Sequence, residues 1–335
     1  MRSLRILLPL GIGIHLGITL WRTDPATASS LLEVSPGWLV LAVALAFLPW
    51  LTNGWRLWNW LRWEDQRRSF ADCVRVVVAS EVGAAVTPTS VGSASVKTAM
   101  LRARGLPLPR ALSLTGMGSL EDALFFATVM PILFLASGVW HDGVFGRLVE
   151  LGANAFASPV RGTIALTIVA VLVAALSHTR WGRTVGDVLR RSWIEWRTLL
   201  GRALTRRPLA WTTNLLLAVV HWVARYSVFT ALLYGLGLEI DPVRGLVLQW
   251  SCFTFMALVP TPGAMGGAEL VFLSLFAGEV PTEVLALLMG AWRVLTFYLL
   301  NLIGLVVLLA GARGPRDADW FAAIGPGPDS VPRGR

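Results

Sequence analysis

The chain has 335 residues, of which 55% are hydrophobic and only 15% are charged, and its mean hydropathy is +0.64. Because soluble domains carry about 25% charged residues, this composition excludes an ordinary soluble protein and indicates a polytopic membrane protein. The net charge of +9 does not indicate a nucleic-acid-binding protein. The arginines gather in short segments between apolar runs, where the positive-inside rule places them.

Six apolar runs have nearly the ~20 residues that a helix needs to cross a bilayer. Only helices satisfy their own backbone in lipid at these lengths, so we predict an all-α fold. The predicted spans are residues 4–21, 36–58, 111–136, 161–178, 209–235 and 284–311. The first run also resembles a signal peptide, with a basic start and Ala-Thr-Ala at 26–28. We expect it to be retained, because the internal repeat described below requires it.

Two further apolar segments, residues 72–103 and 245–279, are broken near their middles by helix-breaking residues. The breaks are Pro88 and Gly92 in the first segment and Pro260, Pro262 and Gly263 in the second. Arginines flank the first segment on both sides, beginning at Arg56, and acidic residues flank the second. Each segment should therefore begin and end on one side of the membrane. We predict two re-entrant broken-helix hairpins that enter from opposite sides.

The charges between the spans predict the topology. The flanks of the first hairpin, near residues 65 and 105, should be cytoplasmic, as should the arginine-rich linker between the fourth and fifth spans. The acidic flanks of the second hairpin, near residues 240 and 281, should be external. Both chain termini are then cytoplasmic in a multi-pass protein of the cell membrane. The tail, residues 312–335, is rich in Gly, Pro, Arg and Asp and is predicted to be disordered.

The two broken segments share one sequence pattern. TPTSVGSA at 87–94 aligns with TPGAMGGA at 261–268, an offset of 174 residues. Each half of the chain then contains two spans, a hairpin and a third span, and three crossings turn the second half upside down. We predict a single membrane domain, residues 1–311, built from an inverted repeat of about residues 1–137 and 160–311. This architecture is typical of transporters.

The hairpin tips are the predicted binding site. A lone proline is explained by a simple kink or by close helix packing, but here both halves break with the same spacing. Broken helices leave backbone groups without partners near the midplane, where they can hold an ion or a phosphate. The predicted lipid-binding residues are Thr87, Pro88, Ser90, Gly92, Ser93, Lys97, Thr261, Pro262, Gly263, Gly266 and Glu269.

Ionisable residues inside apolar segments are costly and therefore indicate function. The predicted gating or coupling residues are Glu81, Glu121, Asp122, Arg225 and Arg293. Glu121 and Arg293 stand at equivalent repeat positions, so we expect an ion pair that either locks the halves or acts in transport. Lys97 follows Gly92 by about one helical turn. It is either a snorkelling interfacial lysine or a cation that holds a lipid phosphate at the cytoplasmic mouth.

The motifs resemble those of the lysylphosphatidylglycerol synthase transmembrane, or flippase-like, family. TPTSVGSASVKTAML resembles the family's Thr-Pro-x-x-x-Gly-Gly-Asp-x-Val-Arg segment, and PTPGAMGGAELV resembles its second, Pro/Gly-rich signature. WRVLTFYLLNLIG resembles the arginine-containing last span. The resemblance covers about residues 36–311.

By this resemblance, Lys97, Glu269 and Arg293 take the places of the family's basic residue, glutamate and last-span arginine. Asp122 matches an acidic residue of the third span. The sequence departs from the family at two positions. They are Ala94, where many members carry an acid, and Ala268, where many carry an arginine.

The resemblance implies movement of charged lipids across the bilayer, such as aminoacylated phosphatidylglycerol or polyprenyl-linked intermediates. The best-known members add a soluble aminoacyltransferase domain, which we expect this chain to lack. We predict a flippase-like transporter of a charged phospholipid or polyprenyl-linked lipid, with a membrane lipid as substrate. No enzymatic activity, cofactor, metal or nucleic-acid partner is expected.

Two alternative functions stay open. One is a non-transporting membrane module of a lipid or envelope biosynthesis complex, with membrane enzymes as partners. The other is a lipid-linked glycosyl- or phosphotransferase. Such an enzyme needs clustered acids for a metal, or a His/Arg phosphatase constellation, near one membrane face, and the sequence shows neither pattern.

Overall fold

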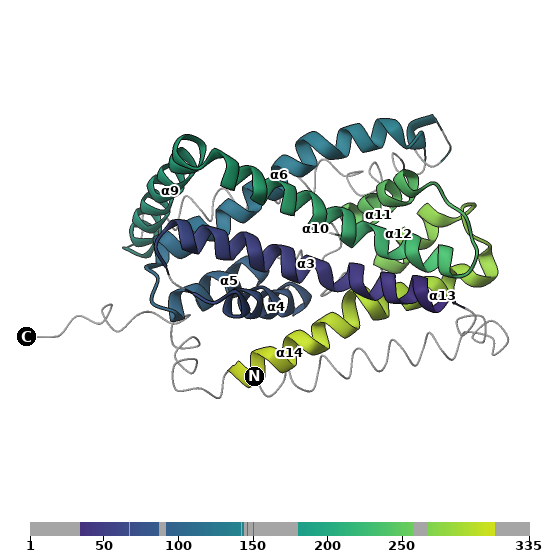
Figure 1. The fold of residues 1–335 in the computed structure, drawn as a ribbon, viewed down its shortest axis with the longest axis horizontal. Coiled ribbons are helices and arrows are strands. Elements are labelled where there is room, and N and C mark those ends of the chain that lie inside the picture. The colour runs from purple at the N-terminus through teal and green to yellow at the C-terminus, as the bar shows by residue number, and fades with distance from the viewer. Residues whose placement is uncertain are drawn as a thin grey trace, which may run out of the picture.

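A computed structural model of the chain (Figure 1) shows a bundle of helices. The structure describes residues 34–66, 68–86, 92–141, 180–256 and 267–311, with positions 143, 146 and 150. The described residues are almost entirely helical and contain one isolated β-bridge, between Ala277 and Val280. The expected spans at 4–21 and 161–178 and the tail at 312–335 lie outside the described residues.

Four helices in the described part of the chain are long and apolar enough to cross a membrane. They are α3 (Pro36–Trp63), α6 (Leu108–Ala136), α10 (Pro208–Gly235) and a last helix formed by α13 (Thr282–Arg293), the π-helix η5 (Val294–Tyr298) and α14 (Leu299–Gly311). The first three each have a proline in the first turn, where the missing N–H costs nothing. Four of the six predicted spans are thereby confirmed.

The arginine-rich linker is itself a helix, α9 (Arg180–Arg206), which the sequence analysis did not predict. It lies across one end of the bundle and packs against α6 (Figure 1). There the hydroxyl of Ser113 donates to the carbonyl of Ser192 at 2.7 Å. Arg202 lies 3.4 Å from Glu64, just after the end of α3. We call this end of the bundle the α9 end and the opposite one the far end.

α3 and α10 form the central pair of the bundle and run antiparallel (Figure 1). At the far end, the amide of Ser35 donates to the carbonyl of Gly235 at 2.8 Å. Toward the α9 end, the Asn59 side chain donates to that of Asn214 at 2.8 Å. The start of each helix therefore lies beside the end of the other, and the two helices are in contact near both ends.

Each broken segment forms two short helices that pack against each other. The first pair is α4 (Phe70–Val86) with α5 (Gly92–Ala103), and the second is α11 (Pro242–Met256) with α12 (Gly267–Phe276). α4 and α5 approach closely at Gly83. A Cβ at this position would lie 2.6 Å from the carbonyl oxygen of Gly92, so no larger residue fits there without a shift. The helices end and resume on either side of the predicted breaks.

An ion pair closes the open base of each helix pair. Arg104 holds Asp72 with two nitrogens, Nη2 at 2.8 Å from Oδ1 and Nε at 3.0 Å from Oδ2. Arg244 holds Glu279 in the same forked manner, with Nε 3.0 Å from Oε2. We call these contacts the two clasps. Through them, the two ends of each broken segment meet, as the sequence predicted, whereas entry into a membrane stays a prediction.

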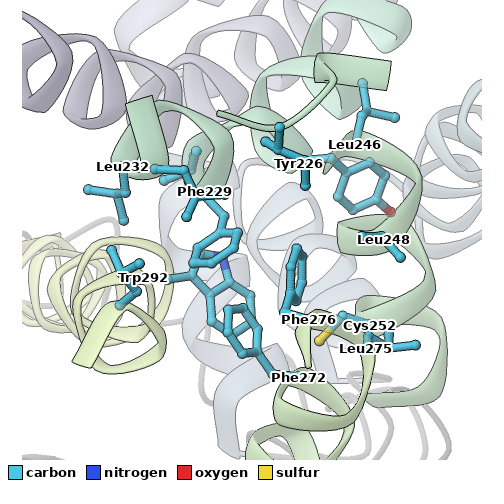
Figure 2. Close-up of a cluster of buried hydrophobic side chains, with 14 of the residues drawn as sticks. Tyr226, Phe229, Leu232, Leu246, Leu248, Cys252, Phe272, Leu275, Phe276 and Trp292 are labelled. Atoms are coloured by element: carbon cyan, nitrogen blue, oxygen red, sulfur yellow. The ribbon is translucent and has the colours of Figure 1, made fainter. Parts of the chain in front are cut away.

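The larger hydrophobic core joins α10, α11, α12 and α13 (Figure 2). Phe229 meets Phe272 edge-on with ring centroids 4.8 Å apart, and Trp292 stacks on Phe272 at 5.0 Å. A second core around Trp60 and Leu114 joins α3, α4, α5 and α6. Each aromatic pair adds about 0.5–1.5 kcal/mol to the burial of its apolar surface, so both helix pairs are firmly attached to the long helices.

Candidate functional site

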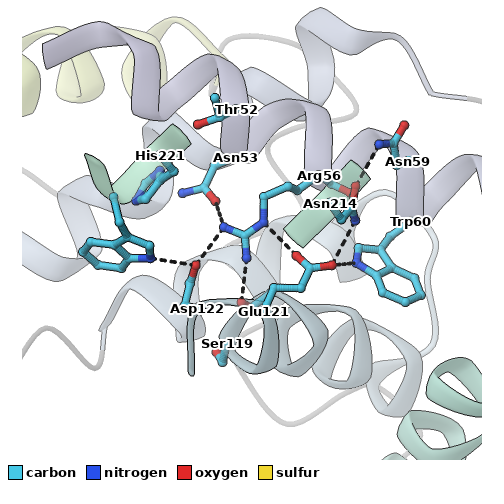
Figure 3. A network of polar contacts seen from close by, with 12 residues as sticks. Thr52, Asn53, Arg56, Asn59, Trp60, Ser119, Glu121, Asp122, Asn214 and His221 are labelled. Atoms are coloured by element: carbon cyan, nitrogen blue, oxygen red, sulfur yellow. Dashed lines mark hydrogen bonds and ion pairs between the residues drawn. The ribbon is translucent and has the colours of Figure 1, made fainter. Parts of the chain in front are cut away.

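The polar centre of the bundle is built around Arg56 of α3 (Figure 3). Its guanidinium side chain is 3% exposed, and Nε donates to Glu121 Oε2 of α6 at 2.7 Å. Nη1 donates to Asp122 Oδ1 and to Asn53 Oδ1, each at 2.8 Å. Nη2 donates to the carbonyl of Gly118 at 2.8 Å. Hydrogen bonds between charged groups are about twice as strong as neutral ones, so these contacts hold the guanidinium rigidly.

Glu121 is fully buried, at 0% exposure, and both of its oxygens accept hydrogen bonds. Oε2 accepts from Arg56, and Oε1 accepts from Trp60 Nε1 at 2.8 Å and from Asn214 Nδ2 at 2.9 Å. A buried carboxylate without such partners would cost several kcal/mol. Glu121 therefore joins α3, α6 and α10 as a fixed element of the site.

Asp122 follows directly in the sequence but has a different environment. Successive helix residues point about 100° apart, so Asp122 turns away from the buried side and its side chain is 29% exposed. Its Oδ1 accepts from both Arg56 and Trp222 Nε1, the latter at 3.0 Å. Among the three charged residues Arg56, Glu121 and Asp122, Asp122 is thus the one whose side chain is accessible at the surface of the bundle.

Lys97 approaches this network from α5. Its ammonium nitrogen lies 3.4 Å from the position that a Cβ would occupy at Gly118. The positive charge of Arg56 and the negative charges of Asp122 and Glu121 all act on the lysine, whose side chain is partly exposed. Within the described part of the chain, however, no hydrogen bond or ion pair holds its ammonium group. The N–H groups of Arg56 that face the site already donate to protein acceptors. The ammonium group of Lys97 can therefore donate hydrogen bonds to a ligand.

A second, looser ion pair connects the two halves of the chain. Arg225 Nη2 of α10 lies 3.7 Å from Glu81 Oε2 of α4. The guanidinium also stands 5.5 Å from the ring centre of Phe253 on α11. Both charged side chains are about one-fifth exposed, and this pair is longer than a good hydrogen bond. The contact is therefore looser than the ion pair of Arg56 with Glu121, whose atoms are 2.7 Å apart.

The third pair lies in the second half. Arg293 Nη2 lies 3.2 Å from Glu269 Oε1, and the rings of Trp292 and Phe297 flank the guanidinium at 5.6 and 5.2 Å. Glu269 stands in the first turn of α12, where the helix dipole favours a negative charge. The π-helix η5 begins directly after Arg293. π-helical turns are frequent at functional sites.

The structure contradicts the expected ion pair between Glu121 and Arg293. Glu121 is bonded to Arg56, and Arg293 is bonded to Glu269. The error began with Arg56, which the sequence analysis assigned to a cytoplasmic flank. α3 continues to Trp63, so Arg56 lies about two turns before its end and inside the bundle.

Sequence reasoning missed five residues of this network: Asn53, Arg56, Trp60, Asn214 and Trp222. A signal was present, because the polar residues at 53, 56 and 59 are spaced by three and therefore share one helix face. The predicted second span, residues 36–58, already contained positions 53 and 56, so counting Arg56 as part of this span rather than of its flank would have placed the polar face inside the membrane domain.

The predicted site residues are only partly described. The structure brings Lys97 to Glu121 and Asp122, with Gly92 and Ser93 in the first turn of the same helix. The hairpin-tip residues Thr87, Pro88, Ser90, Thr261, Pro262, Gly263 and Gly266 lie outside the described residues. The common polar cavity of the two tips therefore stays a prediction. In the described ranges, no group of three or more His, Cys, Asp or Glu side chains is placed to hold a metal.

These observations define a class: a multi-pass helical membrane protein with two broken helix pairs and buried ion pairs. A family model described as "Lysylphosphatidylglycerol synthase TM region" matches residues 6–304, and the chain belongs to this family. The chain is also similar to a UPF0104 membrane protein from Archaeoglobus fulgidus. The two are 25% identical over 277 residues, covering 78% of this chain and 83% of the relative. The family resemblance seen in the motifs is confirmed.

Proposed function

We propose that the protein moves a charged phospholipid or polyprenyl-linked lipid across the membrane, with the anionic headgroup bound beside Lys97. The single observation that carries this proposal is the state of Lys97. Its ammonium group lies next to Gly118, within reach of the charges of Arg56 and of two acids, yet no described residue pairs with it. A hydrogen bond between an ammonium group and an anion is stronger than a neutral hydrogen bond, and a lipid phosphate supplies such an anion.

The element order supports an inverted repeat. Corresponding helices begin at residues 36 and 208, 70 and 242, 92 and 267, and 108 and 282, so each pair is separated by 172–175 residues. α3 and α10, both of 28 residues, run antiparallel and touch at their midpoints. There His221 Nδ1 lies 3.3 Å from the carbonyl of Pro49, and these residues are themselves 172 apart. A two-fold axis at this contact relates the halves as an inverted repeat requires.

The two clasps give a second, independent correspondence. Asp72 and Arg244 begin the two helix pairs 172 residues apart, and Arg104 and Glu279 end them 175 apart. The clasps therefore occupy equivalent positions with their charges exchanged. An inverted repeat predicts this exchange, because the two hairpins then meet opposite faces of the membrane, and the positive-inside rule treats those faces differently.

We infer that the α9 end is cytoplasmic. Arginines gather there, in α9 and around the first clasp, whereas Glu239, Asp241 and Glu279 lie at the far end. The positive-inside rule assigns the arginine-rich end to the cytoplasm. With this orientation the protein lies in the cell membrane with both chain termini cytoplasmic, and Lys97 receives its lipid from the cytoplasmic leaflet.

Transport then follows from rocking of the two halves. The clasps hold each hairpin as a unit, and the buried Arg56–Glu121 pair fixes α3 to α6. The Glu81–Arg225 pair crosses between the halves and is the weakest of these contacts. Opening and closing of this pair is the proposed gating step, which exposes the headgroup site alternately to each side.

The test is reconstitution of the purified protein in liposomes with fluorescent lipids of different headgroup charge. The proposal predicts that labelled phosphatidylglycerol crosses the bilayer faster than in protein-free liposomes. The crossing rate of zwitterionic phosphatidylcholine should increase much less. No acceleration of any anionic lipid by correctly folded protein would contradict transport. That outcome would favour the non-transporting assembly module.

A further inference from the structure

α9 carries more charge than any other described helix and also several large apolar side chains. Its 27 residues include seven arginines against two acids. A linker that only connects two spans needs no such composition. The arrangement of these residues around the helix shows which surfaces they serve.

One stripe of α9 packs onto the bundle. Leu199 and Ala203 are buried, and Ser192 accepts the hydrogen bond from α6 described above. A Cβ at Gly116 of α6 would lie 3.3 Å from Trp196. These α9 residues are spaced by three or four and therefore share one face, so this face is fully occupied by the protein.

A neighbouring stripe of the same helix is apolar but uncovered. Leu189 is 59% exposed, Trp193 57% and Leu204 50%. Four residues separate the first two, and eleven residues, about three turns, separate Trp193 from Leu204, so the three lie on one side. Trp193 also stacks on Trp196 with ring centroids 5.1 Å apart, which fixes this stripe relative to the buried one.

Arginines border the uncovered stripe. Arg190 and Arg197 are exposed and lie along one edge of this stripe, because Arg197 follows Trp193 by about one helical turn and Arg190 precedes Arg197 by about two turns. Among the described residues neither forms an ion pair, in contrast to Arg202, which contacts Glu64. An apolar stripe beside unpaired cations is the pattern of a helix that lies in a membrane interface, where arginines bind lipid phosphates.

The place of α9 in the bundle fits that role. It crosses the end at which α3 ends and α10 begins (Figure 1), and only Arg207 separates it from α10. The spans therefore place α9 at the level of the membrane surface. We propose that α9 is an interfacial helix whose Leu189–Trp193–Leu204 stripe inserts at the headgroup–acyl boundary and whose Arg190 and Arg197 bind anionic phospholipids. This inference requires the membrane-spanning bundle but not lipid transport.

The insertion is tested by lipid quenching of the full-length protein in nanodiscs. In a background of Cys73→Ala and Cys252→Ala, single cysteines replace Leu189 or Leu204 and carry an environment-sensitive fluorophore. Matched controls at Thr198 and Thr205 use exposed residues of the polar side. Spin labels high on the acyl chains should quench the fluorophores on the stripe and leave the controls unchanged. Equal quenching at all four positions, or energy transfer between stripe fluorophores of two protein copies, would overturn the proposal.

The lipid preference is tested with the same fluorophore at Leu204. Spin-labelled phosphatidylglycerol should quench it more strongly than spin-labelled phosphatidylcholine. Each arginine near an anionic surface changes affinity by about fivefold, so Arg190→Gln and Arg197→Gln should each reduce the preference several-fold. Arg202→Gln, which removes an arginine already facing Glu64, should change it little. An unchanged preference in the Arg190→Gln/Arg197→Gln double variant would overturn the assignment of these two arginines.

Discussion

The substitution Arg56→Gln should strongly destabilise the protein. It removes the guanidinium that forms an ion pair with the fully buried Glu121 carboxylate, together with a hydrogen bond to Asp122. Breaking a buried ion pair by removing one partner costs about 3–5 kcal/mol, because the remaining charge stays buried. Trp60 and Asn214 still donate to Glu121, so we expect the lower end, about 3 kcal/mol.

Thermal unfolding of the detergent-solubilised protein, followed by tryptophan fluorescence, measures this effect. One kcal/mol shifts the unfolding temperature of a large domain by roughly 2–4 °C, so Arg56→Gln should lower it by roughly 6–12 °C. Arg62→Gln is the matched control on the same helix. Arg62 is exposed and stands 4.4 Å over the ring of Trp58, a contact worth about 0.5–1 kcal/mol. Its loss should cost less than about 4 °C.

A double variant separates the effect of leaving the Glu121 charge buried without its ion-pair partner from the effect of losing the hydrogen bonds of Arg56. Arg56→Gln combined with Glu121→Gln leaves no uncompensated charge between these two positions, so it should recover part of the stability lost in Arg56→Gln alone. If Arg56→Gln unfolds at the same temperature as Arg62→Gln, the reasoning that places a buried charge network at the centre of the bundle is refuted.

Three further predictions concern the clasps, the topology and the lysine pocket. Arg104→Asp should destabilise the first hairpin, and adding Asp72→Arg should restore much of the loss in the same thermal assay; failure of the exchanged pair to recover would argue against the clasp. Cysteines at Asp65 and Glu239 should react with impermeant reagents from the cytoplasmic and the external side, respectively, and labelling from one side would reject the proposed orientation. Gly118→Val should crowd the Lys97 ammonium and slow lipid translocation more than it lowers stability, whereas unchanged translocation would place the lipid elsewhere.

The sequence predicted the features that depend on length, hydropathy and helix-breaking residues. Four spans lie where apolar runs of about 20 residues require them. The sequence predicted each broken segment from proline and glycine within otherwise apolar sequence, and the described residues show a helix on either side of each predicted break. The basic and acidic flanks predicted two hairpins that enter from opposite membrane faces. The ion pairs Arg104–Asp72 and Arg244–Glu279 join the two ends of each broken segment, and the entry of these segments into the membrane stays a prediction.

The partners of buried charges could not be predicted in this way. The repeat suggested that Glu121 and Arg293 meet, but equivalent positions approach each other only near the symmetry axis. In the proposed inverted repeat, the axis passes through the contact of Pro49 with His221, while α6 and α13 each pack on α10. Each of the two charges therefore finds a partner within its own half.

The sequence analysis did not predict α9, because the segment is polar on average and the helical spacing of its apolar residues was not considered. Seven arginines make the segment look like a solvated linker, and positive-inside reasoning used their charge but not their spacing. The apolar residues at 189, 193, 196 and 200 recur at intervals of three and four, which indicates an amphipathic helix. Helical periodicity has to be examined in charged segments between spans as well as in the spans themselves.

The central claim, that Lys97 holds the anionic headgroup during translocation, is tested most directly in liposomes. Wild type, Lys97→Ala and Lys97→Arg are reconstituted at matched protein levels, and the rate at which labelled phosphatidylglycerol changes leaflet is measured. Lys97→Ala should cut the rate while its unfolding temperature stays near that of wild type, because no ion pair with a described residue is lost. Lys97→Arg should retain much of the rate, because it keeps the charge. Equal rates for wild type and Lys97→Ala would contradict the account and reduce Lys97 to an interfacial anchor.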